Sequence, residues 1–469
     1  MSSATRYSAR FVSLLLAITT SAAAPAQVSL PPTMRATIDS VARAVLAATG
    51  APSASIAVVR DGTIAYTAAY GSARLDPRLA ATPAMRYSIG SVSKQFTSTA
   101  ILLLAERHKL SLNDKVSRWL PDLTRANEIS LRQILSMTSG YQDYWPQDYV
   151  MPPMLAPTTA RTIVNEWARK PLDFEPGTKW QYSNTNFVIA GLIVEKASGM
   201  PLVPFLKKAI FGPLHMESVA ITDDAALGPA DPQAYLRYAL GPPRAAPKEG
   251  KGWLFAAGEL AMTASDLARW DISVIDKTVL RPASYLKQQT DVLLANGVGT
   301  GYGLGVDVGT MNGHRMISHG GEVSGFTSQN TIFPDDRMAV VVLTNIDASR
   351  ASGRIGAGIA NVLLGATDVA TEHAVAQARA IFFGLQHGSI DRGLFTSNAN
   401  AYFSDQALAD FASSLSPLGT PTEVTQVQQS LRGGMTFRAF RIRCGDKTVT
   451  LTTFTLPNGK LEQFQIANG

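Results

Sequence analysis

The first structural signal along the chain is a pair of runs rich in small and β-branched residues, 54–60 and 63–70, which flank Asp61 and Gly62. Asp-Gly between two such runs is typical of a tight β-hairpin turn. Three further strand-like runs occur much later, at 313–318, 326–333 and 338–345. The pattern therefore predicts an antiparallel sheet assembled from both ends of one large domain.

Helical and loop patterns alternate between these strand signals. The segment 95–105 carries no charge and combines small residues with leucines, so we expect a helix buried at the centre of the domain. Further helical patterns lie at 131–135, 186–195, 264–275 and near 354–364. The fold class predicted is α+β, an α/β sandwich in which helices flank the antiparallel sheet and a mostly helical insert joins its two halves.

The composition changes beyond residue 365. Residues 366–376 are small and polar-acidic, which indicates a linker. Two helical patterns, at 377–385 and 405–414, then precede strand-like runs at 436–443, 448–456 and 460–466. This order predicts a small α+β domain over 377–469, vaguely similar to NTF2-like domains. A spacer or lid over the substrate is as plausible a role for it as a binding module.

The first 26 residues have the order of a secretory signal. Arg6 and Arg10 precede an apolar run at 11–18, and small residues follow up to Ala26. The apolar run is too short to span a bilayer, and no later segment reaches the required length. We therefore expect cleavage near Ala26, a secreted or periplasmic protein without stable membrane insertion, and a catalytic domain over 27–365.

Composition narrows the possible partners. A chain of 469 residues with 46% hydrophobic and 17% charged residues is expected to be globular, with more than one domain. The net charge of +6 comes without a dense basic and aromatic block, so no nucleic-acid partner is predicted. The six histidines show no His-Glu-x-x-His pattern, and no glycine-rich segment fits a phosphate loop. Neither a metal nor another cofactor is predicted, and the single Cys444 excludes an internal disulfide.

The strongest chemical signal is a hydroxyl and an amine three residues apart, at Ser91 and Lys94. Residues i and i+3 share one face of a helix, so the amine can reach the serine oxygen. A lysine desolvated in an apolar helix can have a pKa low enough to accept the serine proton. The pattern alone is also compatible with a helix start that carries a surface lysine.

Other motifs follow in a fixed order. They are Leu135-Ser-Met-Thr-Ser-Gly140, Phe174-Glu-Pro-Gly177, Trp180-Gln-Tyr-Ser-Asn184, Ala256-Ala-Gly258 and His319-Gly-Gly321. Together with Ser91-x-x-Lys94 they resemble the serine β-lactamase and penicillin-binding superfamily over residues 34–365. The likeness is greatest to its class C branch, with the related D-alanyl-D-alanine carboxypeptidases, D-aminopeptidases and family VIII esterases.

The resemblance implies roles for four of these residues. Ser91 is expected to be the acyl-accepting nucleophile and Lys94 its base or proton relay. Tyr182 matches a second candidate base, and Asn184 matches the asparagine that orients substrate and lysine. Whether Lys94 or Tyr182 takes the proton stays open at this point. The alternatives are that Tyr182 only packs in the core and that Asn184 only caps a helix starting near residue 186.

His319 occupies the position where β-lactamases of this branch carry lysine. Histidine is mostly neutral above about pH 6.5 and is a weaker partner for an anion. Gly320 and Gly321 are expected to keep a strand edge open to the substrate backbone, and the backbone N–H groups of Ser91 and Glu322 to form an oxyanion hole. The alternative is that His319 is a structural edge-strand histidine. A second departure is Met137, where many relatives carry histidine.

These observations predict an exported serine hydrolase that forms an acyl-enzyme on Ser91. The expected substrates are amides or esters, in a small peptide, a cell-wall-related molecule or an ester compound. Carboxypeptidase, aminopeptidase and esterase activities remain open. The alternative is a catalytically weak protein that binds peptidoglycan stem peptides as a regulator or sensor. A pure binder needs no activated nucleophile, so the retained serine, lysine, tyrosine and asparagine favour the enzyme.

Overall fold

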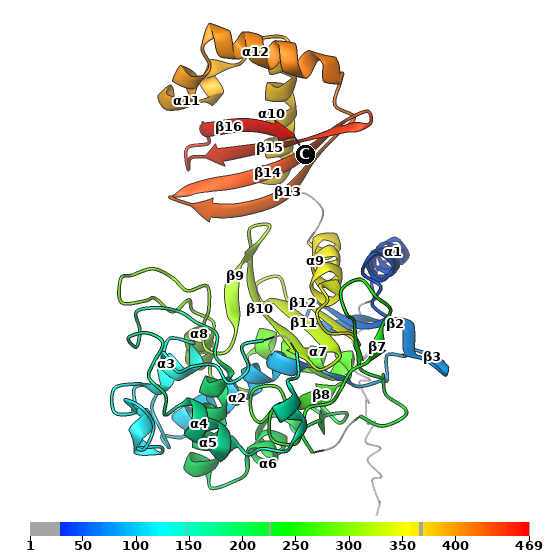
Figure 1. Ribbon diagram of the computed structural model, residues 1–469. Coiled ribbons are helices and arrows are strands. Elements are labelled where there is room, and N and C mark those ends of the chain that lie inside the picture. Colours follow the sequence, from blue (N-terminus) through cyan, green and yellow to red (C-terminus); the bar gives the residue numbers. More distant parts are fainter. Residues whose placement is uncertain (1–28, 148, 225–226, 365–368, 469) are drawn as a thin grey trace, which may run out of the picture.

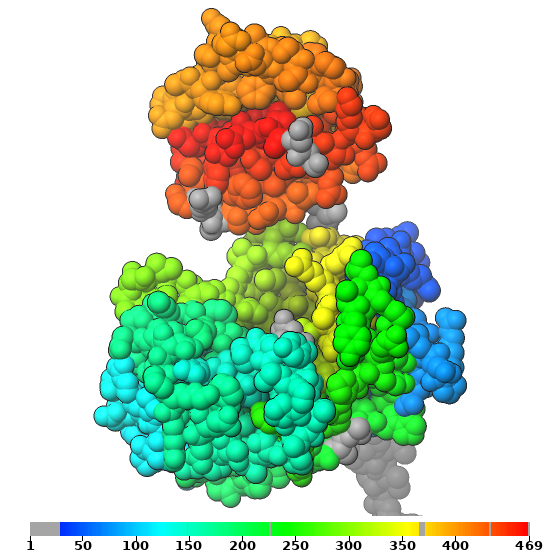
Figure 2. Space-filling view, viewed as in Figure 1, coloured from blue at the N-terminus to red at the C-terminus, as the bar shows by residue number. Residues whose placement is uncertain are grey.

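The computed structural model describes residues 29–147, 149–224, 227–364 and 369–468. The predicted signal segment 1–26 lies outside the described residues. Figure 1 shows a large body that contains most of the chain and a smaller C-terminal body, and Figure 2 shows the latter as a separate mass. Each body has a hydrophobic core of its own.

A seven-stranded antiparallel sheet forms the centre of the large body, in the order β3-β2-β1-β12-β11-β10-β9. Its strands are β1 (Ser53–Arg60), β2 (Thr63–Leu75), β3 (Arg78–Ala80), β9 (Asp307–Met311), β10 (His314–Val323), β11 (Phe326–Phe333) and β12 (Met338–Thr344). Asp61 and Gly62 join β1 to β2, both with positive φ, as the predicted hairpin requires. Because β1 pairs with β12, the sheet does join both ends of the domain, and the predicted fold class is confirmed.

Helices cover both faces of this sheet. All seven residues of β12 are buried, because Val340 and Val342 pack on one side and Val341 and Leu343 on the other. The first side is covered by α1 (Pro32–Thr49) and α9 (Ala351–Leu363). The second side is covered by α2 (Lys94–Glu106) and α7 (Ala264–Asp276), around which the largest core cluster is built.

The insert between the two halves of the sheet is mostly helical, as predicted. Its helices are α3 (Leu131–Leu135), α4 (Ala160–Trp167), α5 (Asn184–Ser198), α6 (Leu202–Leu206) and α8 (Pro282–Gln288). Its short strands are β4 (Tyr87–Ser88), β5 (Ala220–Ile221), β6 (Tyr235–Leu236), β7 (Arg244–Ala245) and β8 (Leu260–Met262). Single turns are η1 (Gly90–Ser93), η2 (Val116–Arg118), η3 (Pro152–Leu155) and η4 (Lys207–Phe211). No single helix among the described residues is long and apolar enough to cross a membrane. Only α5 taken together with Leu202–Phe211 reaches that length and apolar composition among the described helices, as a pair bent by 71°.

The small body is an α+β unit. Its helical elements are α10 (Val369–Gln386), η5 (Arg392–Leu394), α11 (Ser397–Tyr402), α12 (Asp405–Leu415) and η6 (Ser416–Leu418). They precede the four-stranded antiparallel sheet of β13 (Glu423–Arg432), β14 (Met435–Cys444), β15 (Lys447–Thr455) and β16 (Leu461–Asn468). Its core joins residues of α10, such as Phe382, to strand residues such as Phe440 and Leu451. The NTF2-like comparison stays a prediction.

Two details of the small body differ from the sequence-based expectation. Of the predicted linker 366–376, residues 369–376 are helical, because α10 already begins at Val369. Within the predicted linker, Ala374 is buried at helical spacing from Ala378 and Ile381 of the predicted helix, so this part of the linker continues the packed face of that helix. Strand β13 was not predicted because its sequence is rich in glutamine and lacks a clear apolar alternation.

Candidate active site

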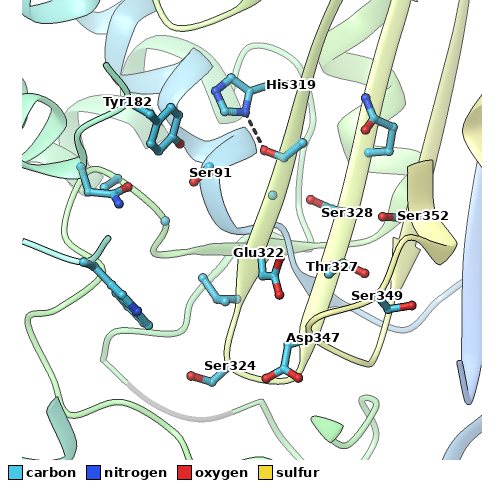
Figure 3. A pocket seen from close by; sticks show the side chains of 18 of the residues that line it. Ser91, Tyr182, His319, Glu322, Ser324, Thr327, Ser328, Asp347, Ser349 and Ser352 are labelled. Carbon is cyan, nitrogen blue, oxygen red and sulfur yellow. Dashed lines mark hydrogen bonds between the residues drawn. The ribbon is translucent and has the colours of Figure 1, made fainter. Parts of the chain in front are cut away.

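A cleft of about 880 Å³ lies beside the N-terminus of α2 and is lined by Ser91, Tyr182, Asn184 and His319. Strands β10 and β11 form one wall, where Figure 3 shows Glu322, Thr327 and Ser328. Tyr144 and Trp145 line the cleft from the loop that follows Gly140. Within the described part of the chain, no three His, Cys, Asp or Glu side chains are grouped to hold a metal ion.

The turn η1 presents Ser91 at the cleft. Gly90, directly before it, has φ of +50°, and a Cβ there would lie 2.7 Å from the backbone N of Glu322. Only glycine permits this approach, which brings the turn before Ser91 against strand β10. The two segments expected to supply the oxyanion-hole N–H groups are therefore in direct contact.

Lys94, the first residue of α2, has no exposed surface. Its Nζ lies 2.8 Å from Ser91 Oγ, 2.8 Å from Asn184 Oδ1 and 2.9 Å from the carbonyl oxygen of Ala257. Burial favours the uncharged amine and lowers the pKa of Lys94 to about 7, although the nearby Asp143 carboxyl opposes this shift. A substantial fraction of Lys94 is thus neutral near pH 7 and able to accept a proton from Ser91.

Tyr182 lies beside the same pair of residues. The Nζ of Lys94 is 5.0 Å from the centre of its ring, and Figure 3 shows the phenol close to Ser91. Burial raises the pKa of Tyr182 far above its ordinary value, although a hydrogen bond with Ser91 opposes the shift. The phenol therefore keeps its proton at neutral pH, so the amine is better suited than the phenol to act as the base.

Asn184 is the first residue of α5 and contacts Lys94, so the alternative that it only caps a helix starting near residue 186 does not hold. Its side-chain oxygen accepts the hydrogen bond from Lys94. Its side-chain nitrogen, Nδ2, donates to Asp143 Oδ2 at 3.3 Å. Sequence reasoning missed Asp143, although an acidic residue three positions after Thr138-Ser139-Gly140 was a visible signal.

Met137 supports the Tyr182-Ser183-Asn184 segment. It is fully buried with φ of +61°, and its sulfur accepts the backbone N–H of Ser183 at 3.5 Å. A second donor, Asn186 Nδ2, lies 3.6 Å from the same sulfur. The thioether thus holds the segment in place as a weak acceptor, which gives this departure from the family pattern a structural role.

His319 lies in β10 with 4% of its surface exposed. Its Nδ1 is 2.5 Å from the carbonyl oxygen of Gly320, and its Nε2 is 3.0 Å from Tyr302 Oη. A carbonyl only accepts, so Nδ1 carries the proton and neutral Nε2 accepts from Tyr302. Burial, with Lys94 nearby, lowers the pKa of His319 to about 4. His319 is therefore neutral as predicted, but both ring nitrogens are already bonded within the protein, as a structural histidine would be.

The two glycines after His319 differ in their surroundings. A Cβ on Gly321 would lie 1.9 Å from the carbonyl oxygen of Ile89, whereas one on Gly320 would meet nothing closer than 3.7 Å. Strand β9 pairs with β10 only as far as Ser318, so the edge beyond it is free of β9. The edge of β10 is open as expected. Glycine at position 321 is nevertheless needed because the backbone of Ile89 lies too close for a side chain, and not only because a substrate must approach.

Comparisons with known proteins agree with this geometry. The family model described as Beta-lactamase matches residues 38–362. Penicillin-binding protein 4* of Bacillus subtilis (strain 168) is 28% identical over 309 residues, which are 62% of this chain and 67% of that protein. D-aminopeptidase of Brucella anthropi is 28% identical over 345 residues, 71% of this chain and 63% of that protein. The chain thus spans about two thirds of the length of these relatives.

Solved structures show the same fold. The octameric penicillin-binding protein homologue from Pyrococcus abyssi has a TM-score of 0.64 at 20% identity, with 93% of this chain and 96% of that chain covered. D-amino acid amidase from Ochrobactrum anthropi SV3 has a TM-score of 0.63 at 22% identity, covering 71% and 100%. A D-stereospecific amidohydrolase from Streptomyces sp. has a TM-score of 0.61 at 26% identity, covering 72% and 100%.

Proposed function

Because the chain belongs to the beta-lactamase family, we propose that it is a serine hydrolase that cleaves an amide bond through an acyl-enzyme on Ser91. The observation that carries the proposal is the buried Lys94 amine, 2.8 Å from Ser91 Oγ and with a pKa near 7. A serine hydroxyl is a weak nucleophile until a neighbouring base removes its proton. The relation to D-aminopeptidase and D-amino acid amidase supports small amides as the substrate class.

The reaction follows from the positions of these groups. Neutral Lys94 accepts the Oγ proton as Ser91 attacks the carbonyl carbon, and the resulting oxyanion meets the N–H groups of Ser91 and Glu322. Collapse breaks the C–N bond, and the leaving amine takes the proton held by Lys94, either directly or through the phenol of Tyr182, which Lys94 then reprotonates; Lys94 is neutral again. Water then attacks the acyl-enzyme with the Lys94 amine as base, which releases the acid and restores Ser91.

The rest of the cleft bears on selectivity. With His319 neutral and its ring nitrogens occupied, this position supplies no cation for a substrate carboxylate. We therefore propose that substrates without a free carboxylate next to the scissile bond are preferred, and that β-lactams are poor substrates. Export also remains part of the proposal, supported by the order of basic, apolar and small residues in 1–26.

The test is intact-mass spectrometry of the mature protein with a fluorophosphonate, D-amino-acid amides, nitrophenyl esters and penicillins. We expect one covalent label on Ser91, turnover of amides or esters, and slow or absent turnover of penicillins. Ser91→Ala should abolish labelling without loss of the fold. Ser324→Ala is the matched control, since Ser324 lines the same cleft but bonds to Glu249, and it should keep the label.

Two results would contradict the proposal. Labelling that persists in Ser91→Ala would place the nucleophile elsewhere. A wild-type protein that binds peptidoglycan stem peptides but is never acylated and turns nothing over would support the alternative, a binding or regulatory protein.

A further inference from the structure

Asp143 is a polar residue of the cleft that the reaction above does not use. We propose that Asp143 is a positioning residue, which fixes the side-chain amide of Asn184 in the one orientation that leaves Lys94 free to act as a base. The inference rests on the proposed function, because it assigns Asp143 a part in the same proton transfer. It does not require Asp143 to touch the substrate.

The contacts of Asp143 define this role. Its Oδ1 accepts the backbone N–H groups of Asn184 at 2.9 Å and of Trp145 at 3.2 Å. Its Oδ2 accepts the side-chain Nδ2 of Asn184 at 3.3 Å. Both oxygens act as acceptors, which is the pattern of a carboxylate and not of an amide. The two bonds from backbone N–H groups hold the carboxylate in place, and the third bond is donated by the Asn184 side chain.

An asparagine amide has nearly the same shape in both orientations, so its bonding partners decide which way it faces. With Nδ2 directed to Asp143, Oδ1 of Asn184 faces Lys94 Nζ at 2.8 Å. If the amide turned over, its NH₂ group would face Lys94 instead. It would then repel the ammonium form, or bind the lone pair of the neutral amine that must accept the Ser91 proton.

The charge of Asp143 has a second effect, which is separate from that of the contacts. Among the described residues, the titratable groups near Lys94 are Tyr182, His319 and Asp143. The carboxylate favours the ammonium and so raises the pKa of Lys94 against the larger effect of burial. Removing the carboxylate should therefore lower the pKa of Lys94, and the acid limb of the activity profile should move to lower pH.

The test compares Asp143→Ala with Asp143→Asn. With alanine at position 143, no carboxylate fixes the orientation of the Asn184 side-chain amide. We therefore expect kcat on an amide substrate to fall about tenfold to a hundredfold with little change in KM. Asparagine is closer in shape but directs its own NH₂ group at that of Asn184, so we expect a larger loss. Both variants should shift the acid limb to lower pH. Asp223→Asn is the control, since Asp223 also accepts two backbone N–H groups but contacts neither Lys94 nor Asn184, and it should leave the profile unchanged.

The exchange variant Asp143→Asn with Asn184→Asp restores complementarity, because the new amide donates to the new carboxylate, whose other oxygen faces Lys94. It should recover part of the kcat lost in Asp143→Asn and move the acid limb to higher pH, since the anion now contacts Lys94. Circular dichroism and denaturant titration report folding of each variant. Equal losses in Asp143→Ala and Asp143→Asn, with an unmoved pH limb and no recovery in the exchange variant, would overturn this inference. Absence of Ser91 labelling in the wild type would instead overturn the proposed function.

Discussion

Burial alone gives Lys94 chemistry that an exposed lysine lacks. Its pKa falls from the usual 10.5 to about 7, so the neutral amine becomes the majority form as pH rises through 7. We predict that log kcat/KM on an amide substrate rises with pH up to about 7 and is level above it. A pH–rate profile between pH 5 and 9 measures this, and His319 adds no limb there because its pKa is about 4.

The control is Lys94→Ala. It should lower kcat/KM by about 10²–10⁴-fold and remove the limb near pH 7, because proton transfer then falls to water or to Tyr182. A variant that keeps the limb near pH 7 would show that another group titrates there and that Lys94 is not the base.

At the scale of the element, β10 carries two adjacent glycines of unequal importance. A methyl group on Gly321 would overlap Ile89 O and Ser328 Oγ and push the Ser91 turn away from the strand, whereas one on Gly320 would meet only ordinary contacts. We predict that Gly321→Ala lowers the free energy of unfolding by about 1–3 kcal/mol and slows labelling of Ser91. Gly320→Ala should change the stability by less than about 1 kcal/mol. Denaturant unfolding and labelling rates measure both, and equal effects would contradict this assignment of the contact.

At the scale of the whole molecule, the residues assigned to the site and the two cores around the large sheet all precede residue 365. The third core contains only residues from Ala374 onward. We predict that a chain ending at Leu364 folds and is still labelled on Ser91, because it keeps its own core. If the small domain restricts the substrate, its removal should change KM for large amides more than acylation by a small ester.

Circular dichroism, labelling and ester kinetics of the shortened and full-length chains test this prediction. The fragment 369–468 expressed alone is the matching control and should fold by itself. An insoluble shortened chain, or a folded one that cannot be labelled, would mean that the C-terminal segment completes the catalytic domain.

Much of the site could be predicted because its residues belong to short motifs. Ser91 and Lys94 share one turn, Tyr182 and Asn184 lie two residues apart, and the hairpin and strand patterns identify the sheet that supports them. The helix at 369–376 was not predicted because an alanine-rich sequence fits a solvated segment and a packed helix equally well. Asp143 was missed because its position close after the Thr138-Ser139-Gly140 motif indicates a role only once its partner, Asn184, is known.

The sequence by itself determined the family, the fold class, the nucleophile and amine that could react, and the neutral residue at position 319. These depend on residue types and on their order along the chain. Only the tertiary structure decided the pKa of Lys94, the orientation of Asn184 and the bonding of His319. Each of these depends on burial and on partners far away in sequence, since Lys94 meets Asn184 and Ala257, and His319 meets Tyr302. Local pattern specifies which groups are present, and long-range packing sets their charge and direction.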